Sequence, residues 1–375
     1  MSSTITAAVM VKPGKIELQD FVRPEVADDA FLLKVQEVGV CGSDKHMYLG
    51  HSLLKFPVIP GHELLGTVEE MGRVVNDQMT VIGGSLSPGD RITVTPSSKG
   101  CGRCYNCIHF PHKPALCPNR TVYGFATCAQ PPHLFGGFSQ YMYIHPKSWV
   151  FKIPETLSDT RATLIEPSAV ATRAVERAYA PGIPHIGEGY GFGKRVLVVG
   201  AGPIGLLTVA ALRHSGAGTI IVTDLSQGRL DVAKRMGADI VIQADGELGE
   251  RVKHVRDLTD GVGPDIVMEC AGVPAAFKEG LELVRRGGKL IEVGHYSDPG
   301  ATDIRPHVVC QKEVDILGVW AYPPLQFQAA LSFLSRCTLP LEELVTHRMS
   351  LERLEEAMKI TGTEGVFKVV IEPYT

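Results

Sequence analysis

Two kinds of hydrophobic pattern divide the chain near residue 165. Before that point, short β-rich stretches alternate with turns that contain Gly and Pro. After it, fully apolar stretches alternate with stretches of helical periodicity. The first pattern is typical of a mostly antiparallel, barrel-like domain. The second is typical of a parallel sheet with helices on both faces.

The individual elements follow from these patterns. In the first part we expect strands at residues 31–40, 66–71, 91–95 and 140–144. In the second we expect strands at 195–199, 219–223, 239–242, 265–269 and 289–293, with helices at 204–215 and 229–236. From about residue 322, the pattern predicts a tail unit of its own over 327–335, 351–361 and 365–371. The sequence therefore predicts an α/β fold with more than one domain.

Composition and charge narrow the class of protein. The chain of 375 residues has 37 Lys and Arg against 41 Asp and Glu, a net charge of −4. This balance argues against a nucleic-acid or membrane-surface binder. The longest uncharged apolar run, residues 196–212, is shorter than the ~20 residues of a membrane-spanning helix. Because the start also lacks the pattern of a secretion signal, we expect a cytoplasmic protein.

A glycine-rich turn follows the strand predicted at 195–199. Gly200, Gly202 and Gly205 fit G-x-G-x-x-G, with Pro203 and Ile204 between the last two. The first glycine permits the tight turn, the second lets the backbone approach a pyrophosphate, and the third lets the helix pack on the strand. The helix N-terminus then offers free N–H groups to the phosphates. We therefore expect a dinucleotide site.

The acidic residue of this fingerprint is Asp224, which ends the next predicted strand. A carboxylate there accepts hydrogen bonds from the ribose hydroxyls and repels a 2′-phosphate, so we expect NAD as the cofactor. Arg229 is the alternative signal, because an arginine can bind the 2′-phosphate of NADP. Its position further along the following helix makes it the weaker of the two.

Four of the nine cysteines fall within one loop. Cys101, Cys104, Cys107 and Cys117 follow C-x2-C-x2-C-x9-C. Thiolates at this spacing can surround one tetrahedral ion and leave no position for substrate, which predicts a structural zinc site. An iron–sulfur centre is the alternative. A histidine of the same loop, at position 109 or 112, is an alternative ligand.

A second set of ligand types lies nearer the N-terminus. Cys41 follows an apolar strand, and the pair His62 and Glu63 comes about twenty residues later. One thiolate with one imidazole and one carboxylate suggests an open, catalytic metal site.

Together these features resemble the zinc-dependent medium-chain alcohol dehydrogenases over the whole chain. The matching motifs are G-V-C-G-S-D at 39–44, G-H-E at 61–63, P-G-D-R at 88–91, the four-cysteine loop, G-A-G-P-I-G at 200–205 and T-H-R at 346–348. The resemblance implies a GroES-like β-rich catalytic domain formed by residues 1–165 and 322–375. It also implies a Rossmann domain with a doubly wound parallel sheet at 166–321. A homodimer or homotetramer is expected on the same ground.

Within that family, L-I-E-P at 164–167 resembles the polyol branch typified by sorbitol dehydrogenase. The resemblance implies Cys41 and His62 as ligands of the catalytic zinc, with Glu63 completing the set directly or through water. Glu166 becomes a fourth ligand or a partner of the zinc-bound water. Lys368, in the last strand, resembles the family's basic contact to the cofactor phosphates.

The expected reaction oxidises a secondary alcohol of a polyol, sugar or cyclitol with two zinc ions per chain. Ser43, two residues after Cys41, is expected to relay the hydroxyl proton, and His46 to pass it to solvent. An L-threonine 3-dehydrogenase or a simple secondary-alcohol dehydrogenase remains the alternative, and C-G-S-D-x-H does not decide, because it also suits the threonine type. A non-catalytic protein that binds zinc and a dinucleotide is the remote alternative.

Overall fold

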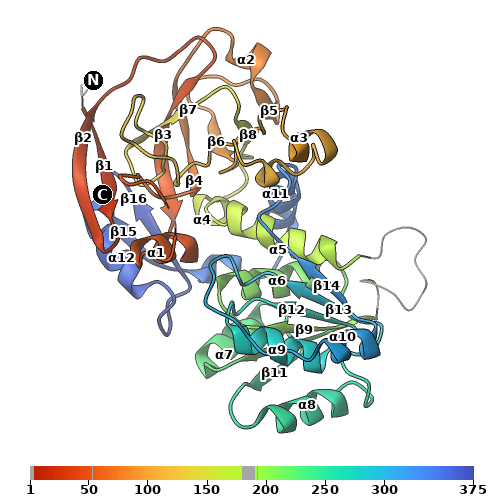
Figure 1. The fold of residues 1–375 in the computed structure, drawn as a ribbon. Helices are drawn as coiled ribbons and strands as arrows, with labels where there is room; N and C mark the ends of the chain where they lie inside the picture. The colour runs from red at the N-terminus through yellow and green to blue at the C-terminus, as the bar shows by residue number, and fades with distance from the viewer. Residues whose placement is uncertain (1–3, 53, 180–190, 192) are drawn as a thin grey trace. The chain divides into compact units, whose positions relative to one another are not determined.

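The computed structural model describes residues 4–52, 54–179, 191 and 193–375. Residues 1–3, part of the stretch considered above for a secretion signal, lie outside this description, as do residues 180–190 and 192 of the predicted Rossmann segment. The chain forms two compact units (Figure 1). The first comprises Met1–Glu166, Pro323–Ser335 and Glu342–Thr375; the second comprises Pro167–Tyr322 and Arg336–Leu341. No helix in the described part of the chain is long and apolar enough to cross a bilayer.

An eight-stranded sheet in the order β15-β16-β3-β4-β6-β8-β5, with β7 paired to β3, forms the frame of the first unit. Its strands are β3 (Phe31–Gly39), β4 (Glu63–Met71), β5 (Thr80–Ile82), β6 (Arg91–Val94), β7 (Tyr141–Ile144), β8 (Trp149–Lys152), β15 (Val345–Ser350) and β16 (Lys368–Glu372). A separate hairpin joins β1 (Thr4–Lys12) to β2 (Lys15–Val22). Most pairings are antiparallel, as the hydrophobic pattern predicts.

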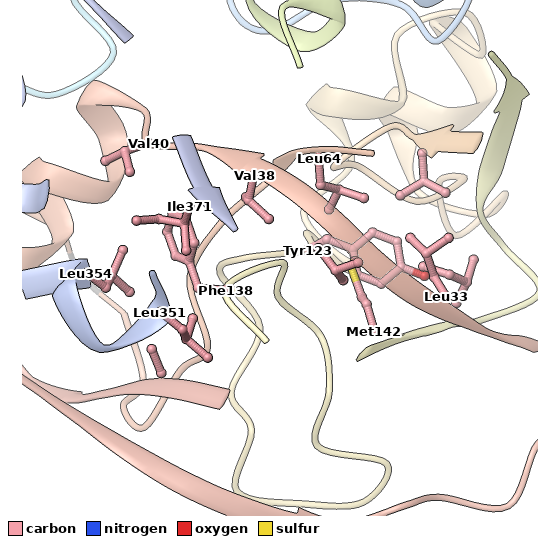
Figure 2. Close-up of a cluster of buried hydrophobic side chains, with 14 of the residues drawn as sticks. Leu33, Val38, Val40, Leu64, Tyr123, Phe138, Met142, Leu351, Leu354 and Ile371 are labelled. Atoms are coloured by element: carbon pink, nitrogen blue, oxygen red, sulfur yellow. The ribbon is translucent and has the colours of Figure 1, made fainter. Parts of the chain in front are cut away.

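The core of the first unit packs against both ends of β3. Figure 2 shows Leu33 and Val38 of β3 among side chains from β4, β16 and the C-terminal helical segment. Ile371 and Leu354, both fully buried, bring the C-terminal segment into this cluster. Burial of each such side chain contributes about 1.5–3 kcal/mol to folding. The far ends of the sequence are therefore tied together by one core.

The segment after residue 322 is not a separate tail. Val370 and Ile371 of β16 pair with Gly39 and Val38 of β3, and β16 also pairs in parallel with β15. The hydrophobic pattern shows the elements of this segment but not its strand partners, because those lie some 330 residues away in sequence. This pairing sets Lys368, the first residue of β16, beside the end of β3.

Short helices connect the strands of the first unit. They are α1 (Gly42–Tyr48), α2 (Val75–Gln78), α3 (Tyr105–His109), α4 (Asp159–Ala162), α12 (Leu354–Ile360) and the 3₁₀ turns η1 (Pro114–Leu116), η2 (Leu341–Leu344) and η3 (Leu351–Arg353). The boundary between the units falls within α5 (Ile165–Arg177), and α11 (Gln326–Arg336) also crosses it.

The second unit is a six-stranded parallel sheet in the order β11-β10-β9-β12-β13-β14. Its strands are β9 (Arg195–Val199), β10 (Thr219–Asp224), β11 (Ile240–Gln243), β12 (Ile266–Glu269), β13 (Lys289–Glu292) and β14 (Asp315–Gly318). Its helices are α6 (Pro203–His214), α7 (Gln227–Arg235), α8 (Leu248–Asp257), α9 (Pro274–Leu283) and α10 (Pro306–Lys312). Because strand order reverses between β9 and β12, the sheet is doubly wound, as predicted.

The helices of the second unit form two groups of contacts, as expected for a sheet with helices on both faces. α6 and α7 pack on each other and on β9, β10 and β11, whereas α8 and α10 both pack on α9. The strands β9, β10 and β12 are buried along most of their length. This double cover explains why these strands show uninterrupted apolar runs in the sequence.

Candidate active site

The turn between β3 and α1 brings the first candidate ligand to the end of the sheet. Cys41 is the N-cap residue of α1. The buried Asp44 accepts a hydrogen bond from the backbone N–H of Cys41 at 2.9 Å and another from that of Gly61 at 3.3 Å. One carboxylate thus fixes the Cys41 turn to the loop that carries His62 and Glu63.

The three predicted ligand residues meet at this point. The thiol of Cys41, a ring nitrogen of His62 and a carboxylate oxygen of Glu63 lie within 4.8 Å of one another. Glu63 begins β4 and pairs with Gly39, where any Cβ would collide with the Glu63 carboxylate. A glycine at the end of β3 is therefore needed for this carboxylate to reach the cluster.

His62 is oriented by its two neighbours. Its Nε2 lies 3.3 Å from the Ser43 hydroxyl, and its Nδ1 lies 3.5 Å from Oδ1 of Asp44. Burial lowers the pKa of His62, but the charges of Asp44 and Cys41 outweigh burial and leave the pKa well above its usual value. The imidazole ring of His62 thus lies between the carboxylate of Asp44 and the other two candidate ligands, Cys41 and Glu63.

These residues fit a zinc ion. Sulfur, nitrogen and oxygen donors are the ligand types that zinc takes in catalytic sites. His62 Nδ1 is buried and, among the residues that the structure describes, has no hydrogen-bond partner of ordinary geometry, although Asp44 lies near it. A buried imidazole beside a thiol and a carboxylate is costly without a cation to bind.

Glu63 has a second partner that the sequence analysis did not foresee. The ammonium of Lys368 lies 2.8 and 2.5 Å from its two carboxylate oxygens, and it also donates to the carbonyl of Val40 at 3.3 Å. Burial lowers the pKa of Lys368, but the charges of Glu63, Cys41 and Glu166 outweigh burial and raise it. No local spacing signals this pair, because it depends on the pairing of β16 with β3.

The cluster of three ligand groups does not include the other predicted residues of this site, which are Glu166, Ser43 and His46. Glu166 is buried and close enough to Lys368 for its charge to act there, but it is not one of the three groups within 4.8 Å. Ser43 contacts His62 directly. His46 lies further along α1, with its Nδ1 3.2 Å from Nδ1 of the exposed His51. Burial, with smaller effects of His51 and Lys45, lowers the pKa of His46.

The four predicted thiols of the cysteine loop also converge. The sulfurs of Cys101, Cys104, Cys107 and Cys117 lie within 4.8 Å of one another, and those of Cys104 and Cys117 are 3.9 Å apart. A tetrahedral zinc with ~2.3 Å bonds to sulfur places its ligands about 3.8 Å apart. The histidines at positions 109 and 112 are not part of this group.

The thiol pKa values show why these four sulfurs need a cation. Backbone N–H groups of Arg103 and Cys104 lower the pKa of Cys101 to about 6. The N–H of Gly102 favours the thiolate of Cys107, but burial and the neighbouring sulfurs outweigh it and raise that pKa to about 11. The sulfurs therefore do not all ionise together without a positive charge among them, which fits a structural zinc.

In the second unit, the glycine-rich turn has the predicted form. Gly200 has a φ of +96°, and Gly202 is the N-cap of α6, with Pro203 in its first turn. A Cβ at Gly205 would collide with the carbonyl oxygen of Gly200. A Cβ at Gly202 would meet no atom within 4 Å, so the space beside this glycine is open to a ligand. The N-terminus of α6 thus presents a cradle that fits a pyrophosphate.

Asp224 ends β10 beside this turn. Its two carboxylate oxygens accept hydrogen bonds from the N–H groups of Ala201, at 2.7 Å, and Ser226, at 2.9 Å. The carboxylate is therefore fixed next to the glycine-rich turn and remains partly exposed. Arg229 lies one turn into α7, where its backbone N–H donates to the Ser226 hydroxyl.

Two family models match the chain. The alcohol dehydrogenase GroES-like domain covers residues 27–155, and the zinc-binding dehydrogenase domain covers residues 203–336. A sorbitol dehydrogenase of Bacillus subtilis (strain 168) is 36% identical over 375 residues, 98% of this chain and 97% of that protein. The chain belongs to the zinc-dependent medium-chain alcohol dehydrogenase family. The predicted resemblance to its polyol branch is confirmed.

Solved structures agree with this family and fold. An alcohol dehydrogenase from Thermotoga maritima has a TM-score of 0.88 and 31% identity and covers 99% of both chains. A zinc-binding dehydrogenase from Sinorhizobium meliloti 1021, bound to NADP, has a TM-score of 0.85 and 28% identity and covers 99% of this chain and 100% of its own. The protein is thus an alcohol dehydrogenase of the two-domain α/β type that acts on a small-molecule alcohol. The matched zinc-binding dehydrogenase domain and the NADP-bound relative confirm that the cofactors are zinc and a nicotinamide dinucleotide.

Proposed function

We propose that this alcohol dehydrogenase transfers hydride between NAD and a secondary alcohol of a polyol, sugar or cyclitol. The observation that carries the proposal is the convergence of Cys41, His62 and Glu63, with the Ser43 hydroxyl against the His62 ring. The similarity to sorbitol dehydrogenase supports the polyol class of substrate. Simple secondary alcohols and L-threonine are the alternative substrates.

Cys41, His62 and Glu63 are the proposed holders of the catalytic zinc, and the four cysteines of the loop hold the structural one. Zinc supplies Lewis-acid chemistry that makes an alcohol hydroxyl acidic near neutral pH. Asp44 orients His62 through the charge of its carboxylate, which lies 3.5 Å from Nδ1, while it fixes the Cys41 turn. Such outer contacts commonly set ring orientation and ligand strength.

Removal of the hydroxyl proton falls to residues of α1. Ser43 is the proposed first acceptor, because its hydroxyl is buried beside the cluster. His46 is the proposed route to solvent. Burial lowers the pKa of His46 and so keeps the imidazole neutral and able to accept a proton at pH 7. The exposed His51 beside it gives that proton an exit.

Lys368 and Glu166 complete the proposed electrostatics of this site. The ammonium of Lys368 contacts both carboxylate oxygens of Glu63, which supports contact of Glu63 with the metal through water as well as direct ligation. A contact of Lys368 with the cofactor phosphates, expected from the family resemblance, would require this ammonium to turn away from Glu63. Glu166 is the proposed partner of the water or hydroxyl at the metal.

NAD is the proposed cofactor because of Asp224. Asp224→Ser removes the charge that repels a 2′-phosphate and should shift the NAD/NADP ratio of kcat/KM towards NADP by about ten- to a hundredfold, the value of one or two hydrogen bonds to a charged group. Arg229→Ala is the matched variant at the alternative position and should leave the ratio nearly unchanged. An unchanged ratio for Asp224→Ser would rule out this role.

The first unit is the proposed catalytic domain, and the second, with the glycine-rich turn, is the proposed NAD-binding domain.

A homodimer or homotetramer is the proposed assembly, since β14 is an edge strand with Ile316 partly exposed. The near-neutral charge supports a protein without nucleic-acid partners. The nine cysteines form no disulfide bond in the part of the chain that the structure describes, which supports a reducing location such as the cytoplasm.

The deciding experiment measures NADH formation with alditols, cyclitols, aldoses, L-threonine and simple secondary alcohols. A preference for a polyhydroxylated substrate supports the proposal, whereas a preference for threonine or a simple alcohol overturns the substrate class.

A variant tests the proposed metal site: Cys41→Ser should lose one zinc per chain and nearly all turnover. Full activity of Cys41→Ser would overturn the proposed site.

A further inference from the structure

A buried glutamate and a half-buried one lie side by side at the carboxyl edge of the parallel sheet. Glu269 is the last residue of β12 and Glu292 the last residue of β13, and the two are direct partners in the register of these strands. Partners in register point to the same face of a sheet, so their carboxylates are neighbours. Like charges in such a pair destabilise a sheet unless something neutralises them.

His295 closes this pair into a group of three. Its Nδ1 lies 2.8 Å from Oε1 of Glu292 and 3.4 Å from Oε2 of Glu269. One ligand atom from each of the three side chains falls within 4.8 Å of the others. In the described part of the chain, His295 is the only basic group within 4 Å of either carboxylate.

The Glu269 carboxylate is fixed and incompletely satisfied. One oxygen accepts hydrogen bonds from the N–H groups of Ala271 and Gly272, each at 2.9 Å. The other oxygen is fully buried and has no hydrogen-bond partner among the described residues. That free oxygen points into the group, since it is the one nearest His295. A buried carboxylate oxygen left unpaired is costly.

A glycine at position 294 leaves room for the carboxylate of Glu269. A Cβ at Gly294 would lie 2.6 Å from the free oxygen of Glu269, so only glycine is accommodated there. In the part of the chain that the structure describes, one oxygen of Glu292 is also buried without a hydrogen-bond partner. The imidazole of His295 is 21% exposed and the Glu292 side chain 18%, which opens the group to solvent on one side.

We propose that Glu269, Glu292 and His295 bind a divalent first-row metal ion of the Mn²⁺ or Zn²⁺ class at the edge of the parallel sheet. Two carboxylates and one imidazole are ligands that these ions accept. Bonds of ~2.1 Å at right angles separate two ligand atoms by about 3 Å. The distances of 2.8 and 3.4 Å bracket that value. The ion would neutralise both carboxylates at once.

This site is separate from the two zinc sites proposed above, because all three ligands belong to the second unit. It lies behind the dinucleotide turn. A Cβ at Gly200 would approach the backbone nitrogen of Ala271 to 2.7 Å, and that same N–H donates to Glu269. An ion bound to Glu269 therefore stabilises the backbone against which the glycine-rich turn packs.

Metal content measured on the zinc-loaded protein tests this site independently of turnover. Mn²⁺ is added, and bound zinc and manganese are counted per chain by mass spectrometry, with free Mn²⁺ followed by electron paramagnetic resonance. Glu292→Gln and His295→Gln each remove one ligand and keep most of the side-chain volume. Asp303→Asn is the matched control, because it removes an exposed carboxylate of the same unit outside the group.

The wild type and Asp303→Asn should bind one ion more per chain than Glu292→Gln and His295→Gln, or bind Mn²⁺ at least tenfold more tightly. Crystals soaked in Mn²⁺ should show an anomalous peak between the three side chains. Equal metal content and equal Mn²⁺ affinity in all four proteins would overturn the proposal. In that outcome a proton shared by the two carboxyl groups neutralises the pair, and Glu292→Gln should then raise thermal stability.

Discussion

The ammonium of Lys368 contacts both carboxylate oxygens of Glu63, and neither side chain is more than 4% exposed. Lys368 opens β16 and Glu63 opens β4, so the contact joins two segments that lie 305 residues apart in the sequence. An isolated charge at this depth would be strongly unfavourable. Each residue therefore depends on the other.

In the metal-free protein, replacing Lys368 by Met should destabilise the fold by about 3–5 kcal/mol, because it leaves Glu63 buried without a cation. The double variant Lys368→Met with Glu63→Gln should recover part of that loss. Lys289→Met, which breaks a pair with the largely exposed Asp315, is the control and should cost about 1 kcal/mol or less. Denaturant unfolding measures all four proteins. Equal losses for Lys368→Met and Lys289→Met would contradict this account.

The sequence was sufficient to predict what depends on local spacing. The alternation of apolar strands and helices predicts the parallel sheet, and G-x-G-x-x-G predicts the tight turn at Gly200. The four cysteines predict their own convergence, since short gaps in a loop leave few other arrangements. The family resemblance added the GroES-like domain, which hydrophobic patterning alone describes only as barrel-like.

Contacts between distant segments could not be predicted in this way. The Lys368–Glu63 pair needs β16 beside β3, and register in a sheet depends on partners that hydrophobic periodicity does not name. Glu269 and Glu292 look like ordinary strand ends in the sequence, and only the pairing of β12 with β13 makes them neighbours. The hairpin of β1 and β2 was not predicted either, because its exposed second strand lacks an apolar face long enough to detect.

His145 should make stability depend on pH. Burial, helped by Lys147, lowers the pKa of this imidazole from 6.5 to about 4. Its Nδ1 accepts a hydrogen bond from the backbone N–H of Lys147, which requires the neutral ring. Between pH 6.5 and 4 the unfolded chain binds more protons than the folded one, so stability falls as the pH falls through this window.

His145→Phe should flatten that dependence, measured as the free energy of unfolding at several pH values between 6.5 and 4. The new ring would pack against Tyr123 and Phe135, whose rings already lie near the imidazole. His254→Gln, at an exposed position of α8, should keep the wild-type slope. Loss of metal at low pH acts on all three proteins alike. Identical slopes would mean that His145 does not stay neutral in the fold.

The cysteine loop should bind metal for structure and not for turnover. Cys104→Ser should remove one zinc per chain, lower the midpoint of thermal unfolding and leave the zinc at Cys41 in place. Cys128→Ser is the control: this thiol is buried and lies outside the four-sulfur group, so the zinc content should not change. Atomic absorption with differential scanning calorimetry measures both effects. Loss of both zinc ions in Cys104→Ser would show that the sites are not independent.

Substitutions at two glycines of the dinucleotide turn should distinguish an effect on stability from an effect on cofactor binding. Gly205→Ala drives a Cβ into the carbonyl of Gly200, so the fold should lose about 1–3 kcal/mol or more. Gly202→Ala meets no atom and has a φ of −72°, which alanine adopts, so stability should change by no more than about 0.5 kcal/mol. The added methyl group nevertheless occupies the space open to the pyrophosphate. The dissociation constant of NADH, from fluorescence titration, should therefore rise about ten- to a hundredfold, as expected for the loss of a charged hydrogen bond. Unchanged affinity in a stable Gly202→Ala would place the phosphates elsewhere.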